Sequence, residues 1–450
     1  MTAPMKQIRT AAELELVERF AKVRDLLPGS DKVQAVRETA FARFERQGLP
    51  HRRVEEWKYS DLRARLKTVA PVTLKPDSEF AGEVLRTYVD PFDGMDRYRL
   101  VLVDGYFDMD ASDRDALLSE GVEVAGLRDL LETGGDMATD LLSNPESGAD
   151  DIAVSLNSAF ATDGAVVLIP KGTRLSKPIE ILSLASATAP AAIHLRNRIV
   201  VGDDVDATIL EVSSGGTTGS EINLFNEYRV GDGVTLTVAR LQETDTGATH
   251  IASNFVSLGE KTDVKHLSVE SGAGFSRNQT FLGFAGQHSR AEILGVSMLH
   301  DDRHIDQTLV VDHAVPHCES GEIFKTVADD RSSGVFQGKI VVRPDAQKTN
   351  GKMMSQALLL SEEAQMAAKP ELEIYADDVV CGHGATSGQI DASMLFYLMA
   401  RGIPRAEAER LLIEAFLADA VDAIDKEAIA DVLKQKISDW LSTRKDARSA

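Results

Sequence analysis

The chain is poor in cysteine and tryptophan. Its 450 residues include only two of each, and the cysteines are Cys318 and Cys381. Two thiols are too few for a disulfide framework, which favours a reducing compartment. The first residues contain no continuous apolar run typical of a secretory signal. No stretch of about 18 apolar residues predicts a membrane span either. We therefore expect a cytoplasmic, globular protein that makes no contact with a membrane.

Several motifs of nucleotide binding and catalysis are also missing. The sequence has no G-x-x-x-x-G-K-[ST] loop, no G-x-G-x-x-G turn, no G-x-S-x-G elbow, no H-E-x-x-H and no C-x-x-C. Positive charge is scarce as well, because 71 acidic side chains outnumber 49 basic ones and leave a net charge of −22. A surface of that sign repels phosphate backbones, so we expect no nucleic-acid partner.

Helical periodicity marks the first part of the chain, which we delimit as residues 1–150. Apolar residues at helical spacing predict one helix that includes Leu16 to Val23 and a second that starts near Asp31. The stretch HRRVEEWKYSDL (51–62) carries one of the two tryptophans. It predicts the start of an amphipathic helix whose Trp57 packs on a neighbouring element.

The sequence pattern changes in the second part, residues 151–390. Short runs of Val, Ile, Leu and Thr alternate there with Gly and Asp turns, which is typical of strands. Turn glycines recur at intervals of 29, 28 and 27 residues, and an apolar residue stands five positions after each. The glycines are Gly202, Gly231, Gly259 and Gly286, and the apolar residues are Ala207, Leu236, Val264 and Ala291.

This repeat predicts a stacked coil of strands. Apolar positions that recur in register over a repeat of this length are buried together when successive strands pair along the coil. The predicted fold class is therefore mainly β, with a β-helix or related solenoid as its core. A β-sandwich or jelly roll is the alternative.

Helical patterns return in the third part, residues 391–450. MLFYLMARG closes on Gly402, and Pro404 stands where the next helix begins, since a first-turn proline loses no hydrogen bond. The last predicted helix has an apolar stripe that runs from Ile429 to Leu441. These helices shield the end of the coil or offer an apolar groove to a partner.

Five of the ten histidines lie between positions 288 and 317. His313, His317 and Cys318 are the candidates for a metal group here, because imidazole and thiolate groups bind zinc or iron. Their spacing matches neither a compact zinc finger nor a facial triad, so structural or interfacial histidines are the favoured interpretation.

Cys381 and His383 form a second group. Residues i and i+2 of a strand share a face, so the thiol and the imidazole point the same way. Two ligands do not complete a tetrahedral metal site, which leaves the other ligands to this chain or to a second one. Gly382 and Gly384 leave the opposite face bare. The strand lies near the end of the predicted coil, at an edge that must be capped or paired. A shared interface site and a buried thiol with a packing histidine both remain open.

Several segments longer than these short motifs resemble a known protein family. Residues 346–412, which contain AQKTNGKMMSQ and CGHGATSGQ, resemble the SufB/SufD family of iron–sulfur cluster assembly proteins. SSGVFQGKIVV (332–342), VDHAVPHCESGEIFKTVADDRS (311–332) and RRVEEWKYSDL (52–62) support it. The resemblance covers essentially the whole chain. Within the family CGHGAT is similar to the SufD branch, since SufB-type chains tend to have acidic residues around the corresponding cysteine and histidine; TNGKMMSQ is a local departure.

The resemblance implies a right-handed parallel β-helix between an N-terminal helical region and a C-terminal helical domain. It also implies a non-catalytic scaffold subunit that pairs with a SufB-like chain through the ends of the coils. A SufC-like ATPase would bind the C-terminal helices, for which we select Leu412, Phe416 and Trp440. His383 matches the histidine that faces SufB at the site of cluster assembly, and Cys381 matches a nearby cysteine.

The family role further implies iron acquisition, a nascent iron–sulfur cluster or iron at the SufB interface, and reduced flavin in the complex. Whether the chain forms a homodimer when the partner is absent stays open. Two other interpretations stay open. One is a SufB-like chain that carries the principal cluster site itself. The other is a β-helix carbohydrate-active enzyme, which the low tryptophan content disfavours.

Overall fold

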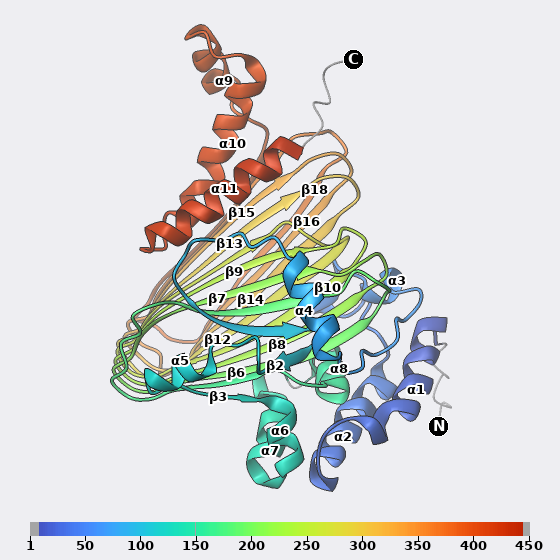
Figure 1. The fold of residues 1–450 in the computed structure, drawn as a ribbon. Coiled ribbons are helices and arrows are strands. Elements are labelled where there is room, and N and C mark those ends of the chain that lie inside the picture. The colour runs from blue at the N-terminus through green and yellow to red at the C-terminus, as the bar shows by residue number, and fades with distance from the viewer. Residues whose placement is uncertain (1–8, 149, 444–450) are drawn as a thin grey trace, which may run out of the picture.

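The computed structural model describes residues 9–148 and 150–443 and consists mainly of a parallel β-solenoid of about eight turns (Figure 1). Two sheets form its walls, and successive strands from β4 onward alternate between them. In spatial order, the first sheet contains β19 (Val380–Gly388), β17 (Asn350–Leu359), β15 (Glu319–Ala328), β13 (Arg290–Leu299), β11 (Asp263–Glu270), β9 (Thr235–Thr244), β7 (Asp206–Gly215), β5 (Ile179–Ala185), β1 (Tyr98–Val103) and β2 (Tyr106–Asp108).

The second sheet faces the first across the interior of the coil. It contains β18 (Gln365–Ile374), β16 (Ser333–Val342), β14 (His304–His313), β12 (Phe275–Phe284), β10 (Thr249–Leu258), β8 (Glu221–Val230), β6 (Ala192–Val201), β4 (Ala165–Ile169) and β3 (Glu123–Gly126). Among the described strands, only β2 and β3 pair antiparallel with their neighbours. Through β1 and β2, the first sheet begins within the part of the chain that the sequence analysis assigns to the N-terminal region.

The predicted repeat is confirmed in the register of the first sheet. Ala207 lies opposite Leu236, Leu236 opposite Val264, and Val264 opposite Ala291. All four side chains are buried in the core between the two sheets. Parallel pairing of strands one turn apart is the geometry of a solenoid, so the alternative of a sandwich or jelly roll is wrong.

The helices of residues 11–47 and 152–160 cover the outer face of the second sheet, whereas the helix of residues 78–87 packs on β1 of the first sheet (Figure 1). The first two predicted helices are confirmed, and the helix after Gly48 is replaced by shorter pieces. The helices are α1 (Ala11–Val23), α2 (Asp31–Gln47), α3 (Leu62–Arg65), α4 (Ser78–Thr87), α5 (Arg114–Ser119), α6 (Leu127–Thr133), α7 (Gly135–Leu142) and α8 (Ile152–Phe160), with 3₁₀ turns η1 (Arg24–Leu26), η2 (Glu55–Trp57) and η3 (Glu146–Gly148).

The segment around Trp57 is pinned to the coil by a buried polar network. The Trp57 side chain is 2% exposed, and the Arg277 guanidinium lies 4.0 Å from the centre of its ring. Arg277 also pairs with Asp306 at 2.5 Å. The Ser60 hydroxyl lies 2.8 Å from Nε2 of His304. These contacts to β12 and β14 explain why a 3₁₀ turn, rather than the start of a regular helix, is found here.

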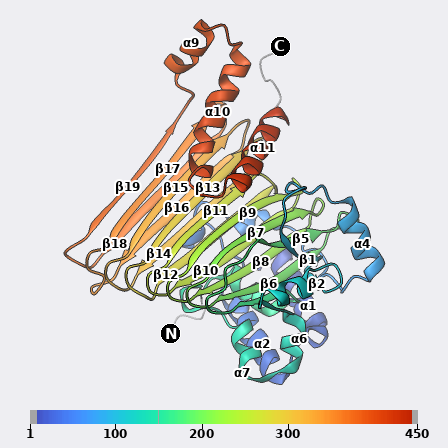
Figure 2. The same cartoon turned by 60° about the vertical axis from the view of Figure 1, so that its left-hand side comes forward.

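The C-terminal helices are α9 (Ala392–Ala400), α10 (Arg405–Val421) and α11 (Glu427–Thr443). Helices α10 and α11 lie on the outer face of the first sheet, and α9 extends furthest from the coil (Figure 2). The apolar stripe from Ile429 to Leu441 is buried as predicted. Among the described helices, none combines the length and apolar character that crossing a membrane requires.

Candidate functional site

Cys381 and His383 lie on β19, the outermost strand of the first sheet (Figure 2). Cys381 is opposite Gly351 of the preceding turn, and His383 is opposite Met353. Met353 is buried in the coil interior, and Cys381 packs against the same core while remaining half-buried. The His383 side chain is exposed. Both side chains therefore stand at the open end of the coil, on its interior side, as expected for residues i and i+2 of a strand.

A buried carboxyl group lies inside the coil, two strands away from β19 in the first sheet. Glu322, on β15, occupies the same column as Met353 and His383 and is fully buried. Neither of its carboxyl oxygens has a hydrogen-bond partner among the described residues. Burial raises its pKa to about 8. The nearby Ser320 hydroxyl moderates this shift, but its own hydrogen bond joins Nε2 of His313 at 2.9 Å.

The Cys381 thiol is held in its protonated form. Burial raises the pKa of this thiol, and the charge of Glu322 adds to that effect, whereas a backbone hydrogen bond with Gly351 opposes it. Thiolate, not thiol, is the metal ligand. Metal binding at Cys381 would therefore release a proton and would be favoured by higher pH.

The outer face of β19 is bare at one point. A side-chain carbon added at Gly382 would meet no atom within 4 Å, whereas at Gly384 it would meet Sδ of Met354 at 3.2 Å. Val380 and Tyr375, at the same end of the coil, are 66% and 62% exposed. Within the described part of the chain, β18 and β19 each pair on one side only. This end of the coil therefore has the features of a partner surface.

The second candidate group does not come together. His313 is buried and stacks on Phe284, and Cys318 is buried with its thiol directed to the carbonyl oxygen of Gly286 at 3.4 Å. His317 is exposed on the turn that joins β14 to β15. Among the described residues, these three do not place their donor atoms within 4.8 Å of one another.

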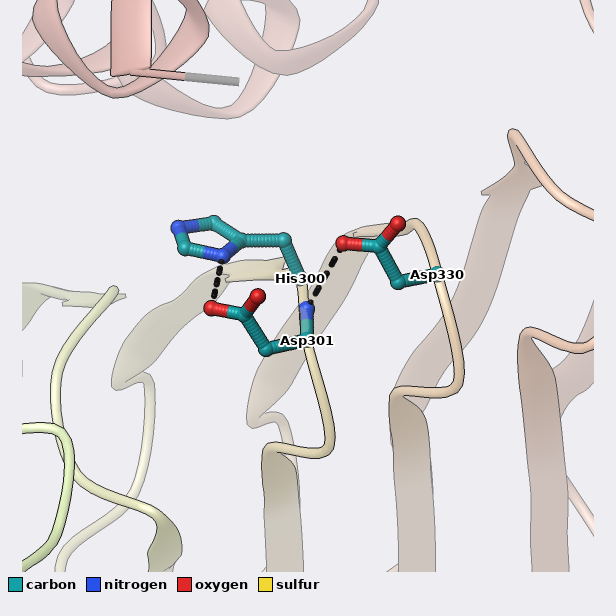
Figure 3. A group of neighbouring side chains, drawn as sticks. All are labelled: His300, Asp301 and Asp330. Carbon is teal, nitrogen blue, oxygen red and sulfur yellow. Dashed lines mark hydrogen bonds and ion pairs between the residues drawn. The ribbon is translucent and has the colours of Figure 1, made fainter. Parts of the chain in front are cut away.

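Sequence reasoning missed one compact group of potential metal ligands, His300, Asp301 and Asp330 (Figure 3). Nδ1 of His300 lies 2.7 Å from Oδ2 of Asp301, and the Asp301 backbone N–H donates to Oδ2 of Asp330 at 2.9 Å. Asp330 follows Asp301 by 29 residues, which is one period of the coil. These contacts join the turns of two successive rungs, so they account for the cluster without a metal.

Of Leu412, Phe416 and Trp440, the residues predicted to bind an ATPase, two lie in the contact between the C-terminal helices and the coil. Phe416 packs against the sheet with the Lys325 ammonium 4.7 Å from its ring centre, and Trp440 is 7% exposed. Leu412 is half-buried. Four of the exposed apolar side chains lie instead on α9, and Leu411 on α10 is also exposed; those on α9 are Met394, Phe396, Tyr397 and Met399.

Two family models match the chain. The SufBD core domain of the SUF system for FeS cluster assembly matches residues 183–416, and the SufBD protein N-terminal region matches residues 10–181. An iron–sulfur cluster assembly SufBD family protein of Synechocystis sp. is 30% identical over 402 residues, which is 87% of each chain. The chain belongs to the SufBD family.

Within this family the chain is SufD-like. The iron–sulfur cluster assembly protein SufD of Escherichia coli is 28% identical over 408 residues, or 88% of this chain and 90% of its relative. SufD of Bacillus subtilis is 27% identical over 292 residues, or 63% and 66%. The SufD-like assignment of the chain is thereby confirmed, and the alternative of a carbohydrate-active enzyme is set aside.

Proposed function

We propose that this SufD-like chain is a non-catalytic cytoplasmic scaffold subunit that acquires iron and helps to assemble an iron–sulfur cluster at the open end of its coil. A SufB-like chain would complete the site. The observation that carries the proposal is the position of Cys381 and His383 on the outermost strand. They supply two metal donors where an iron or cluster site needs more.

Each residue at this end has a separate part in the proposed assembly. His383, which is exposed, presents its imidazole to the partner. Cys381 gives up its proton when it binds iron, since only the thiolate is a ligand. Gly382 allows the partner backbone to approach the outer face of β19. When the SufB-like chain is absent, a second copy of this chain would pair through the same edge.

Reduced flavin is part of the proposed complex, but one cavity of this chain does not fit it. The cavity lined by Leu184, Ile193, Ser213 and Ile222 measures about 10 Å³. That volume holds about one water molecule, whereas pockets for ligands of flavin size measure several hundred Å³. A flavin in the complex would therefore bind elsewhere, such as on surfaces that the partner chains help to form.

The scaffold role predicts what an anaerobic purification recovers. A tagged copy of the chain, isolated from its own cells, should bring down a SufB-like chain and a SufC-like ATPase together with iron and sulfide. The His383→Ala variant should bring down the same proteins but form clusters about tenfold more slowly or worse, since loss of even a supporting group at a metal site costs that much. Partner stoichiometry and the rate of cluster formation are measured on the same samples.

His51→Ala is the control, because His51 lies in the N-terminal region before η2 and not on β19. It should form clusters at the unmodified rate. Normal cluster formation by His383→Ala would contradict the proposed ligand. Recovery of the chain alone and free of metal would contradict the scaffold role itself.

We propose α9 as the main contact for the ATPase, with Leu412 of α10 beside it. Phe416 and Trp440 would act indirectly, by holding α10 and α11 on the sheet. Phe396 is 72% exposed, and large aromatic side chains are common energetic centres of interfaces. Phe396→Ser should weaken ATPase binding by about 2 kcal/mol, or roughly 30-fold, while the unfolding temperature stays unchanged.

Titration of the purified ATPase against the complete chain measures this effect. Leu74→Ser is the control, because Leu74 is 79% exposed but lies in the N-terminal region. Equal ATPase affinity for Phe396→Ser and Leu74→Ser would rule out Phe396 as a contact.

A further inference from the structure

Two exposed histidines occupy the same position on successive turns of the coil. His288 precedes β13 and His317 precedes β15, and these strands are direct neighbours. Their backbone φ angles are 59° and 62°, in the left-handed region that histidine tolerates better than most residues. The two imidazole rings are stacked, with centres 4.8 Å apart and planes 15° from parallel. The coil geometry therefore places two nitrogen donors side by side in solvent.

The ring nitrogens are available for a ligand. Across residues 9–148 and 150–443, no side chain or backbone group makes a hydrogen bond to either ring. The rings lie on a row of turns in which Lys261 and Lys348 are the outer neighbours. Both ammonium groups are paired, Lys261 with Glu260 at 2.7 Å and Lys348 with Asp378. Repulsion between these lysines and a bound cation is therefore reduced.

Packing alone does not account for the arrangement. Both rings are exposed, so their stacking removes little apolar surface from water. The row also does not continue as an aromatic ladder, because lysines flank it on both sides.

We propose that His288 and His317 bind one divalent transition-metal ion, each through one imidazole nitrogen, with water in the remaining positions. Imidazole suits zinc, nickel, copper and iron, whereas calcium and magnesium prefer oxygen ligands. Metal–nitrogen distances near 2 Å require two ligating nitrogens to lie within about 4 Å of each other. Because the stacked rings are nearly parallel, both exposed side chains must rotate before their in-plane nitrogen lone pairs converge on one ion. Among the described residues, no hydrogen bond holds either ring in its present orientation. The site is separate from the end of the coil and does not depend on the proposed function.

Calorimetric titration of the complete chain with Ni²⁺ tests the proposal. We expect one Ni²⁺ to bind with an affinity that falls about tenfold or more in His288→Ala and in His317→Ala, since removal of even a supporting group costs a metal site that much. The double variant should lose this binding altogether. Both side chains are on the surface, so unfolding temperatures should fall only by the small cost of placing alanine in the left-handed region.

Two further variants separate this site from the other candidates. His383→Ala removes a donor from the end of the coil, and His300→Ala removes the imidazole of the cluster in Figure 3. His300→Ala should bind Ni²⁺ as the unmodified chain does, and His383→Ala should keep the Ni²⁺ ion that the His288→Ala/His317→Ala double variant loses. Unchanged binding by the His288→Ala/His317→Ala double variant would overturn the proposal. Loss of binding only in His300→Ala or only in His383→Ala would overturn it too, and would assign the ion to that other position.

Discussion

Replacement of Arg277 by alanine should lower the free energy of unfolding by about 3–5 kcal/mol, the usual cost of breaking a buried ion pair. Arg277 is 1% exposed and pairs with Asp306, which is fully buried. The guanidinium also lies against the Trp57 ring and donates to the backbone carbonyl of Glu56 at 2.9 Å. The variant would leave the Asp306 carboxylate buried with only neutral hydrogen-bond donors and would detach the Trp57 segment.

Denaturant unfolding, followed by tryptophan fluorescence and circular dichroism, measures this loss. Arg331→Ala is the control, because Arg331 makes a two-point pair with Asp302 on an exposed turn, where ion pairs contribute little. It should leave the unfolding midpoint unchanged. A loss below about 1 kcal/mol in Arg277→Ala would show that the network around Trp57 is not a major source of stability.

Replacement of Glu322 by methionine should instead raise the free energy of unfolding. Glu322 stands between Ile293 and Met353 in an interior column, so methionine matches its surroundings in size and polarity. The pKa of Glu322 is about 8 in the folded chain, against an ordinary value of 4.5. Between these two pH values the folded state holds a proton that the unfolded state has released, and stability therefore falls as the pH rises.

At pH 7 this difference in proton binding corresponds to about 3 kcal/mol. Glu322→Met should be more stable than the unmodified chain by about that amount at pH 7, and the two should converge near pH 4. Unfolding free energies measured from pH 4 to pH 8 test this. Glu319→Met changes an exposed glutamate of the same strand and should leave the pH profile as it is. An unchanged slope in Glu322→Met would mean that Glu322 is charged and compensated in the folded chain.

The coil was predictable because each turn repeats the same pattern of turn glycines and apolar residues. The position that Leu236 occupies is buried in every turn, so the spacing of the turn glycines is enough to align Val264 and Ala291 with it. The position of Cys381 and His383 near the end of the coil followed from the return of helical patterns after residue 390. Both inferences needed only short-range periodicity.

Contacts between distant segments were not predictable in this way. Nothing in the sequence near Trp57 indicates that Arg277 will stack on it, because that contact depends on where the N-terminal segment crosses the finished sheet. The C-terminal stripe predicted burial of Trp440 but not the surface that buries it. The His288–His317 pair is an intermediate case. The two are one period of the coil apart, so extending the repeat by one turn would have found them.

The long reach of the Trp57 segment has a consequence for the order of folding. Its polar contacts with the coil join residues that are 221 to 314 positions apart, from Glu56 with Arg277 to Glu55 with Lys369. The rungs of a solenoid need only their neighbours and can form as they leave the ribosome. The segment, in contrast, must wait for its last contact for about 15–60 s of synthesis. Trp57 itself contacts Arg277 of β12, so it is covered before β18 is made, whereas Glu55 waits for Lys369 of β18. A chain cut short before β12 would keep this tryptophan exposed to chaperones and proteases.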